Sequence, residues 1–342
     1  MSDTSTLRIG LLSFAHLHAA SYARVLSALP GIEVLATDPG HENRPAGEIG
    51  GAEAAAEFGV PYVDDIDALL AWQPDGVIVC SENANHRAHV ELLVAAGIPV
   101  LCEKPLATST EDARAMVKAA EAAGVALMVA FPVRFSTAFA ALRERIEAGA
   151  LGTICAVTGT NNGRVPTGRA WFTDPELAGG GALTDHTVHV ADLMDALLGG
   201  QRARSVYAQS NQIMHPQARV ETAGLVSIEY PGGVIATIDC SWSKPTDYPT
   251  WGGLTLSVVG SAATADMDAF GSRVDGFSGA QRAPVWLPYG ADSDAALIAE
   301  FVDAIRTGRT PQPDGRVGLR TVEIVEAAYA SAAAGEPVAL DS

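Results

Sequence analysis

The chain has 342 residues, 48% of them hydrophobic, and a positive mean hydropathy, which excludes a disordered protein and allows two domains that each have a full core. Its net charge of −18 at pH 7 is scattered without a long acidic run. This balance argues against nucleic acid and anionic membrane surfaces as partners.

The N-terminus and the cysteines favour a cytoplasmic protein. Met1–Thr4 contain no basic region or apolar signal core, and no apolar stretch reaches the length of a membrane span. The four cysteines fall in apolar, strand-like runs and form no Cys-x-x-Cys pair: Cys80, Cys102, Cys155 and Cys240. We therefore expect buried, reduced thiols.

The first part of the chain alternates strand and helix signals. Apolar, strand-like runs occur at residues 7–12, 33–36, 76–80, 99–102 and 126–130. Helical patterns lie between them at residues 20–29, 52–58, 86–96 and 110–123, and a further helix at 137–148 leads onward. Short apolar strands separated by helices predict a parallel sheet covered on both faces, here a domain over residues 1–130.

From about residue 152 the pattern changes to strands joined by short turns. Such runs occur at residues 206–209, 222–229, 233–241 and 254–260, which favours a mostly antiparallel sheet. One helix precedes them, from about residue 184 to 198, and two follow, at 294–307 and 317–333. We predict a second, α+β domain over residues 131–342, whose last helices can pack back on the first domain.

The turn after the first strand occupies the place of a dinucleotide-binding fingerprint, although its glycines are missing. Ser13, Ala15 and His18 stand at the expected glycine positions, and His18 is bulky for close helix–strand packing. Backbone amides from Ser13 to His16, including that of Phe14, can still reach a phosphate. The alternative is a degenerate turn that binds no nucleotide.

Polar residues after three later strands extend this candidate cofactor site. Asp38 follows the second strand and suits a ribose 2′-hydroxyl, which favours NAD over NADP. Ser81, Asn83 and His86 follow the third strand, where Asn83 either caps the next helix or contacts a ligand. Six of the eight histidines come in close pairs, but no cysteine joins them and we expect no metal.

Two distant stretches look like halves of one active site. Glu103-Lys104-Pro105 ends an apolar strand, and Lys104 is one of only three lysines. Three glycines at 179–181 precede Asp185 and His189, which lie four residues apart and so on one face of a helix. A lysine amine and a histidine are suited to moving a hydroxyl proton. The alternative is that Lys104 is an ordinary surface lysine and that His189 has no catalytic role.

Taken together, these residues resemble the Gfo/Idh/MocA family of NAD(P)-dependent oxidoreductases. The similarity runs nearly end to end. It includes Asn83-x-x-His86, Glu103-Lys104-Pro105-Leu106, the stretch from Trp171 through Asp174-Pro175-Glu176-Leu177 and the three glycines to Asp185 and His189, and Ala327-Ala328-Tyr329. The resemblance implies a Rossmann domain followed by an α+β domain with an open-faced sheet, commonly used for contacts within a homodimer or homotetramer.

The resemblance also implies residue roles. The family's catalytic lysine, aspartate and histidine match Lys104, Asp185 and His189, with Lys104 entering from one domain and the other two from the second across a cleft. Cofactor contacts fall to the turn and the strand ends named above, with Glu103 and Lys104 added. The substrate side is expected to involve Arg164, Arg169, Trp171 and His186.

The expected activity is reversible, NAD-dependent oxidation of a secondary hydroxyl on a sugar- or polyol-like substrate. His189 takes the hydroxyl proton, Lys104 polarises the oxygen or relays the proton, and Asp185 positions one of them. Two alternatives stay open. One is an NAD-assisted enzyme with a non-redox outcome, such as glycoside cleavage or elimination. The other is a non-enzymatic sensor that keeps the fold.

Overall fold

The computed structural model describes residues 6–280 and 282–340, so Met1–Thr4 and the expectation attached to them lie outside the described residues. The chain forms two compact units. The first comprises the residues up to Phe131 together with Pro166–Gly179 and Asp294–Leu319. The second comprises Pro132–Val165, Gly180–Ser293 and the residues from Arg320 onward. No helix among the described residues is long and apolar enough to cross a membrane.

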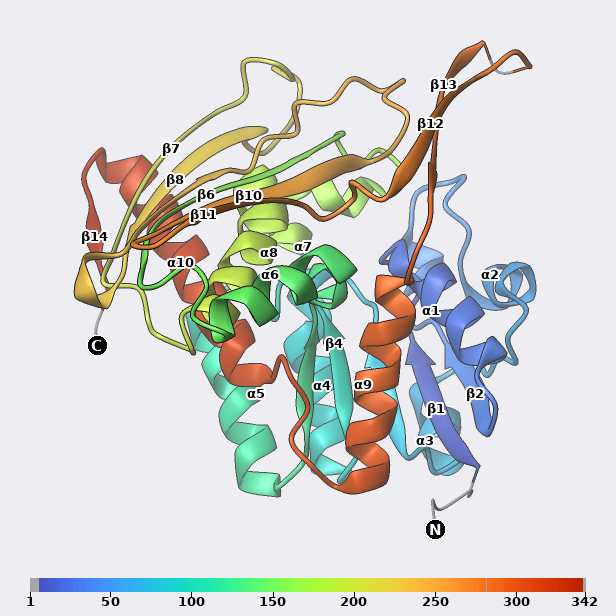
Figure 1. Ribbon diagram of the computed structural model, residues 1–342. Coiled ribbons are helices and arrows are strands. Elements are labelled where there is room, and N and C mark those ends of the chain that lie inside the picture. The colour runs from blue at the N-terminus through green and yellow to red at the C-terminus, as the bar shows by residue number, and fades with distance from the viewer. Residues whose placement is uncertain (1–5, 281, 341–342) are drawn as a thin grey trace. The chain divides into compact units, whose positions relative to one another are not determined.

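The first unit contains a five-stranded parallel sheet with helices around it (Figure 1). Its elements in chain order are β1 (Leu7–Leu12), α1 (His18–Ala28), β2 (Ile32–Thr37), α2 (Gly51–Phe58), α3 (Ile66–Ala71), β3 (Gly76–Val79), α4 (His86–Ala95), β4 (Val100–Glu103), α5 (Thr110–Ala123), β5 (Leu127–Ala130), α7 (Pro175–Ala178) and α9 (Ser293–Thr307). Short 3-10 turns add His41–Asn43, Asn83–Asn85 and Ala170–Thr173.

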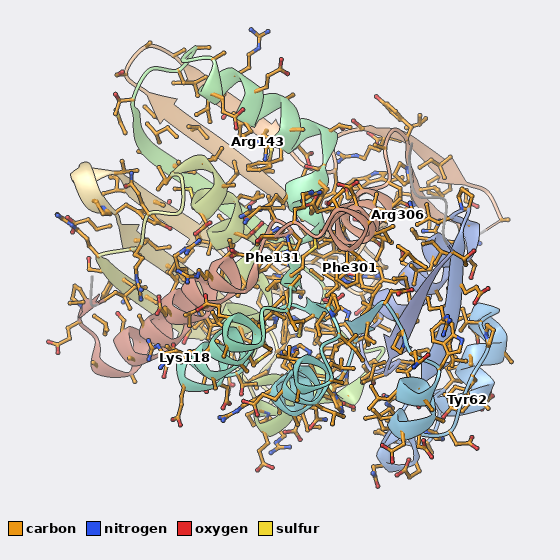
Figure 2. The ribbon with its side chains drawn as sticks, turned by 90° about the horizontal axis from the view of Figure 1, so that it is seen from below. Tyr62, Lys118, Phe131, Arg143, Phe301 and Arg306 are labelled. Carbon is orange, nitrogen blue, oxygen red and sulfur yellow. The ribbon has the colours of Figure 1, made fainter. Side chains whose placement is uncertain are left out.

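Local sequence explains these elements. Strands β3, β4 and β5 are buried at every position, as expected for a sheet covered on both faces. Helix α5 begins where the Ser109 hydroxyl accepts the Asp112 amide at 3.1 Å, and it ends at Gly124 in the left-handed conformation. Ile305 and Phe301 of α9 fill the space where a Cβ on Gly76 would lie, so a helix from late in the chain covers this sheet (Figure 2).

The second unit contains a seven-stranded mixed sheet and a separate hairpin. Its elements are α6 (Thr137–Glu147), β6 (Ile154–Gly163), α8 (Ala182–Leu197), β7 (Ser205–Asn211), β8 (Ala223–Glu229), β9 (Ile235–Asp239), β10 (Gly252–Gly260), β11 (Thr264–Asp268), β12 (Arg273–Ser278), β13 (Ala283–Pro288) and β14 (Val338–Ala339), with 3-10 turns at Pro132–Phe135 and Pro231–Gly233. Helix α10 (Gly315–Ala334) begins in the first unit and ends in the second.

The strand order of the large sheet is β11-β10-β6-β9-β8-β7-β14. Helix α8 packs on one face, and its buried residues, such as Val190 and Met194, share a core with the sheet. The other face carries exposed apolar side chains, including Leu225 and Ile235. Within the described part of the chain, β12 and β13 pair with each other alone, and they project from this sheet (Figure 1).

The predicted fold class is confirmed, with several corrections. The sheet of the second unit is mostly antiparallel, but β6 and β9 pair in parallel. Strands β6, β11, β12, β13 and β14 and the short helices α3 and α7 were not predicted. The expectation of buried thiols is wrong for Cys155, which is exposed because it lies on the outward side of β6, whereas the other three cysteines are buried.

Candidate functional site: two groups of residues

The carboxyl ends of β1, β3 and β4 form one edge of the parallel sheet. The strand order β2-β1-β3-β4-β5 reverses direction at β1, so the crevice between the loops after β1 and β3 is the topological switch point. Open parallel sheets bind ligands at this point. The amide of His16 donates to the Cys80 carbonyl at 2.8 Å, which ties the two loops together.

The turn after β1 is built without glycine. Ser13 adopts a left-handed conformation with φ of 74°, which is uncommon for a residue other than glycine. Its amide donates to the Thr37 carbonyl at 2.8 Å, and its hydroxyl accepts the Ala15 amide at 3.2 Å. The hydroxyl also donates to Asp38 at 3.1 Å, so side-chain bonds stabilise a turn that glycine usually forms.

The carboxylate of Asp38 is fully buried and surrounded by donors from the protein. The guanidinium of Arg44 makes two contacts of 2.6 Å with it, and the amides of Phe14 and Gly51 donate at 2.8 and 2.9 Å. Burial alone would raise the pKa of Asp38, but these donors, Arg44 foremost, hold it below its usual value. The carboxylate therefore anchors the turn, and a ribose hydroxyl has to displace Arg44 to reach it.

The charges around Arg44 nearly cancel. Its Nε lies 3.9 Å from Glu82, and a second buried arginine, Arg169, lies 3.8 Å from Glu48. With Asp38, three carboxylates meet two guanidinium groups, so this region has a formal charge of −1. Such a region offers little net attraction for a 2′-phosphate even though it contains arginine.

The segment Pro166–Gly179 belongs to the first unit and lies against the turn. The indole of Trp171 donates to the Ala15 carbonyl at 3.0 Å, and Arg169 donates to the Phe14 carbonyl at 3.2 Å. The ring of His16 contacts Phe172 at 5.3 Å between centroids. Trp171 and Arg169, expected on the substrate side, are thus braces for the candidate nucleotide turn.

A buried cluster surrounds Glu103 at the end of β4. One carboxylate oxygen accepts Nδ1–H of His18 at 2.9 Å and the hydroxyl of Tyr22 at 2.6 Å, and the other accepts the Lys104 amide at 3.1 Å. Burial would raise the pKa of Glu103, but His16 and His18 hold it well below its usual range. The effect on His18 is the converse. Burial of the His18 ring lowers its pKa, but the negative charge of Glu103 outweighs this and raises the pKa of His18 above 6.5. This is an ion pair between the fully buried Glu103 and the one-third exposed His18, and it lies beside the candidate catalytic lysine.

Three groups of this cluster have the composition of a metal site: His16, His18 and Glu103, with ligand atoms within 4.8 Å of one another. The amide of His18, however, donates to Nδ1 of His16 at 3.2 Å, so the neutral ring carries its proton on Nε2. Metal binding at Nε2 requires the other tautomer, and His18 Nδ1 is already bonded to Glu103. The arrangement is therefore that of an ion-pair network.

The loop after β3 is fixed by its own side chains. His86 is fully buried, and its ring nitrogens lie 3.1 Å from the Ser81 carbonyl and 3.0 Å from the Pro105 carbonyl. Asn83 donates to the Ala178 carbonyl at 2.8 Å. His86 thereby joins the loop after β3 to the loop that carries Lys104, a side chain with 4% exposure.

The second unit carries the other predicted catalytic residues on α8, whose start is tightly packed. Glu221 accepts the amides of Gly181 and Leu183 at 3.0 and 2.9 Å and the hydroxyl of Tyr329 at 2.8 Å. A Cβ on Gly180 would overlap the Tyr329 hydroxyl, and one on Gly181 would overlap the Glu221 carbonyl. Glycine is required here, and Glu221 acts as a distant cap of the helix.

The carboxylate of Asp185 lies among aromatic side chains. Its Oδ2 is 3.2 Å from Nε2 of His186 and accepts the indole N–H of Trp242 at 3.2 Å. The amide side chain of Asn161 donates to the His186 carbonyl at 3.2 Å. His189 follows one turn later on α8 and is 7% exposed.

Arg164, another predicted substrate residue, lies in the second unit on the loop after β6. Its guanidinium donates to the Thr246 carbonyl at 3.0 Å, and its amide donates to the Trp251 carbonyl at 2.6 Å. Arg164 thus braces the loop before β10. Sequence reasoning missed Arg44, His18, Tyr22, Glu221 and Trp242 as parts of these groups, and only the bulk of His18 at a glycine position gave a signal.

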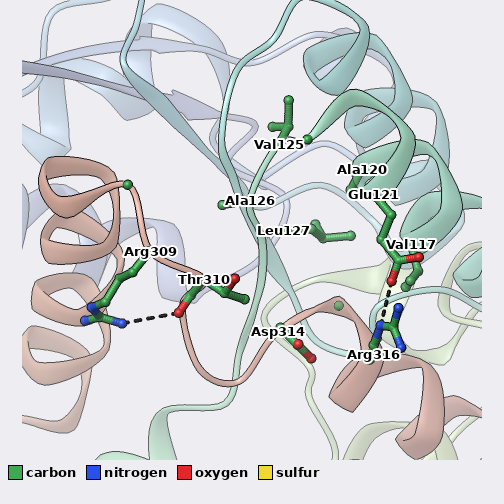
Figure 3. Close-up of a pocket in the computed structure, with 13 residues that line it drawn as sticks. Val117, Ala120, Glu121, Val125, Ala126, Leu127, Arg309, Thr310, Asp314 and Arg316 are labelled. Atoms are coloured by element: carbon green, nitrogen blue, oxygen red, sulfur yellow. Dashed lines mark hydrogen bonds and ion pairs between the residues drawn. The ribbon is translucent and has the colours of Figure 1, made fainter.

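A pocket in the first unit lies elsewhere (Figure 3). It is formed by the end of α5, the start of β5 and the loop before α10, and Arg316 pairs with Glu121 across it at 2.6 Å. This is the amino end of β5. Parallel sheets bind ligands at the opposite, carboxyl edge, so this pocket is unrelated to the groups described above.

Comparison with known proteins gives a consistent result. Residues 37–131 match the model of an oxidoreductase family with an NAD-binding Rossmann fold, and residues 139–266 match the GFO/IDH/MocA C-terminal domain. D-apiose dehydrogenase of Paraburkholderia graminis is 30% identical, over 97% of this chain and 88% of that protein. Inositol 2-dehydrogenase of Cereibacter sphaeroides is 28% identical, over 98% of this chain and 97% of that protein.

A solved structure agrees with these relatives. GenD2 from gentamicin A biosynthesis, in complex with NAD, matches with a TM-score of 0.87 at 27% identity, over 99% of this chain and 97% of that one. The two matched domains follow each other along the chain as its two sheets do. With a relative 30% identical over nearly its whole length, the chain belongs to the GFO/IDH/MocA family of oxidoreductases.

Proposed function

We propose that the protein is an NAD-dependent dehydrogenase that oxidises a secondary hydroxyl of a sugar- or polyol-like substrate. The observation that carries this is the combination of Lys104 at the end of β4 with Asp185 and His189 on α8, in a chain of an NAD-binding oxidoreductase family. Relatives named for apiose and inositol support the substrate class.

The first unit fits a dinucleotide. Its switch-point crevice is bordered by a tight turn with a left-handed residue, and the start of α1 has no side-chain cap. The proposed contacts are the turn Ser13–His16, Ser81, Asn83 and the Glu103–Lys104 segment. Asp38 shapes the turn through Arg44, and the local charge of −1 favours NAD over NADP. We assign the buried His86 a positioning role. When bound, NAD supplies the hydride acceptor at nicotinamide C4.

The remaining chemistry is proton transfer by the chain's own residues. His189 removes the hydroxyl proton, since histidine is the side chain best suited to this near neutral pH. Lys104 polarises the substrate oxygen or relays its proton, because an ammonium group stabilises a developing alkoxide. Asp185, bonded to His186 and Trp242, is a fixed negative charge on the same helix as His189.

The substituted fingerprint favours one other function. Because Ser13, Ala15 and His18 replace glycines, a sensor that binds NAD or a sugar without turnover remains the second candidate. A homodimer or homotetramer also stays a prediction, supported by the exposed apolar side chains Leu225 and Ile235 on the open sheet. A cytoplasmic location is proposed from the cysteine pattern alone.

Calorimetric titration with NAD and with NADP tests the cofactor assignment. We expect NAD to bind more tightly, because the charge around Arg44 offers little net attraction for a 2′-phosphate. If neither NAD nor NADP binds, the dehydrogenase proposal is contradicted. Binding of NAD without any reduction in the presence of cyclic and acyclic polyols supports the sensor.

The variants Lys104→Met and His189→Ala test the catalytic roles. Each should lower kcat/KM by about 10²- to 10⁴-fold, the usual contribution of a general acid or base, while NAD affinity changes little. Lys118→Met is the matched control, since Lys118 is an exposed lysine of the same unit on α5 (Figure 2). Full turnover in both variants shows that the catalytic assignment is wrong.

A further inference from the structure

A partly exposed tryptophan lies beside His186, the neighbour of Asp185, in the second unit. Trp251 precedes β10 and is 39% exposed. Phe270 contacts its ring at 5.5 Å between centroids and an interplanar angle of 89°, and His186 contacts it at 5.9 Å and 65°. The ring is therefore held by edge-to-face contacts while about two-fifths of the residue stays open.

The backbone beneath this ring is shaped for it. Gly163 pairs with Gly252 across β6 and β10. A Cβ on Gly163 would come within 2.8 Å of the His186 ring and 3.1 Å of the Trp251 ring, so both rings converge on the same face of Gly163. The Arg164 amide holds the Trp251 carbonyl at 2.6 Å. A glycine at 163 thus allows Trp251 and His186 to approach each other.

Polar groups border the aromatic surface on one side. His186 joins Trp251 to the carboxylate of Asp185, which also accepts the indole N–H of the buried Trp242. A surface that combines an open aromatic face with a fixed carboxylate and an imidazole suits a ligand with an apolar face and a hydroxylated edge. The ring C–H groups of a pyranose or a cyclitol form such a face, whereas a flexible acyclic chain does not hold one.

We propose that Trp251, braced by Phe270 and His186, is the stacking surface for the substrate ring and selects cyclic over acyclic polyols. This proposal rests on the proposed dehydrogenase function and goes beyond it by naming a specificity-determining residue. His186 packs between Trp251 and Asp185 and holds both side chains in place.

The test compares Trp251→Ala and Trp251→Phe with the wild-type full chain. The probes are methyl α-D-glucopyranoside and myo-inositol as cyclic compounds and D-sorbitol as an acyclic one. For a cyclic probe that is oxidised, Trp251→Ala should raise KM by about 20-fold with a smaller change in kcat, because the stacking contact is made before the chemical step. Trp251→Phe should retain most of the affinity for the cyclic probe. If the wild type oxidises sorbitol, both variants should oxidise it at a similar rate, because an acyclic chain does not stack on the ring.

A binding measurement separates this proposal from the proposed function. Cyclic probes should quench tryptophan fluorescence in the wild type without NAD, and this quenching should disappear in Trp251→Ala but persist in Trp72→Ala, a control in the first unit. If no cyclic probe quenches the wild type, or if quenching and KM are unchanged in Trp251→Ala, the stacking proposal is overturned. Quenching that depends on Trp251 without any NAD reduction retains the stacking site and contradicts only the dehydrogenase.

Discussion

The turn after β1 in the first unit and the start of α8 in the second are both places where family resemblance implies glycine, yet only the second contains it. At the turn, Ser13 takes the left-handed conformation and its hydroxyl bonds to Asp38 and the Ala15 amide. At α8, a Cβ on Gly180 or Gly181 would overlap Tyr329 or the Glu221 backbone. Side-chain hydrogen bonds can stabilise a turn that lacks the conformational freedom of glycine. They cannot make room for a Cβ atom where the neighbouring atoms leave no space.

The largest expected effect tests whether Asp38 stabilises the turn after β1. Asp38→Ala leaves Arg44 buried without its carboxylate and the amides of Phe14 and Gly51 without an acceptor. Breaking a buried ion pair in this way costs about 3–5 kcal/mol in the free energy of unfolding. Urea unfolding measures the loss, and Glu121→Gln, which removes the half-exposed Arg316 pair, is the control expected to change little. An equal loss in both variants contradicts a special role for Asp38.

The start of α8 should tolerate a methyl group poorly. Gly181→Ala places a Cβ against the backbone carbonyl of Glu221, which cannot rotate away as a side chain can. We expect a loss of about 3 kcal/mol, near the upper end for overpacking. Thermal unfolding measures it, and Gly253→Ala serves as a control, because a Cβ there meets nothing within 4 Å and, as at Gly181, the φ lies outside the left-handed region. Comparable losses would attribute the effect at Gly181 to backbone conformation.

Much of the first unit follows from sequence because its strands are buried on both faces. Strand β1 and helix α5 have the predicted bounds, since an apolar run and a Ser109–Gly124 pair of caps mark them locally. Strand β6 was missed because its second half, Thr158–Gly163, is polar and faces partly outward. The polar residues at the strand ends were predictable from the rule that parallel sheets bind ligands there.

The partners of those residues were not predictable. Asp38 meets Arg44, a loop residue six positions away with no helical or strand periodicity to place it. Glu221 reaches α8 from the segment before β8, 40 positions after Gly181. Such contacts depend on how the loops fold back, and a single sequence carries no signal for that.

The ion pair beside Lys104 should make stability depend on pH. Glu103→Gln removes the partner of His18, Tyr22 and the Lys104 amide, with Asp294 and Lys104 as the other charges acting on His18. We expect a loss of about 2 kcal/mol near pH 6. Since Glu103 raises the pKa of His18, the pair's contribution is complete below about pH 6.5 and declines as pH rises through the raised value.

At low pH, the stability contributed by the ion pair is limited by the protonation of Glu103. Its pKa is lowered in the folded state, so its contribution is complete above the ordinary value of about 4.5 and is lost only as pH falls well below that. The difference between wild type and Glu103→Gln should therefore be widest from about pH 5 to 6.5 and narrower at pH 9. A difference in unfolding free energy that stays constant over this range contradicts the ion pair.

The smallest expected effect sharpens the comparison most, because it restores a glycine where the chain has lost one. Ser13→Gly relieves the left-handed strain but loses the hydroxyl bonds to Asp38, Ala15 and Arg44 and adds freedom to the unfolded chain, so we expect a net loss below about 1 kcal/mol. Ser13→Ala loses the same bonds and keeps the strain, so it should be less stable than Ser13→Gly by about 1 kcal/mol. Outside the left-handed region alanine is usually the more stable of the two. Urea unfolding of both variants decides the order, and an alanine variant at least as stable as the glycine variant shows that the turn does not depend on the φ of Ser13.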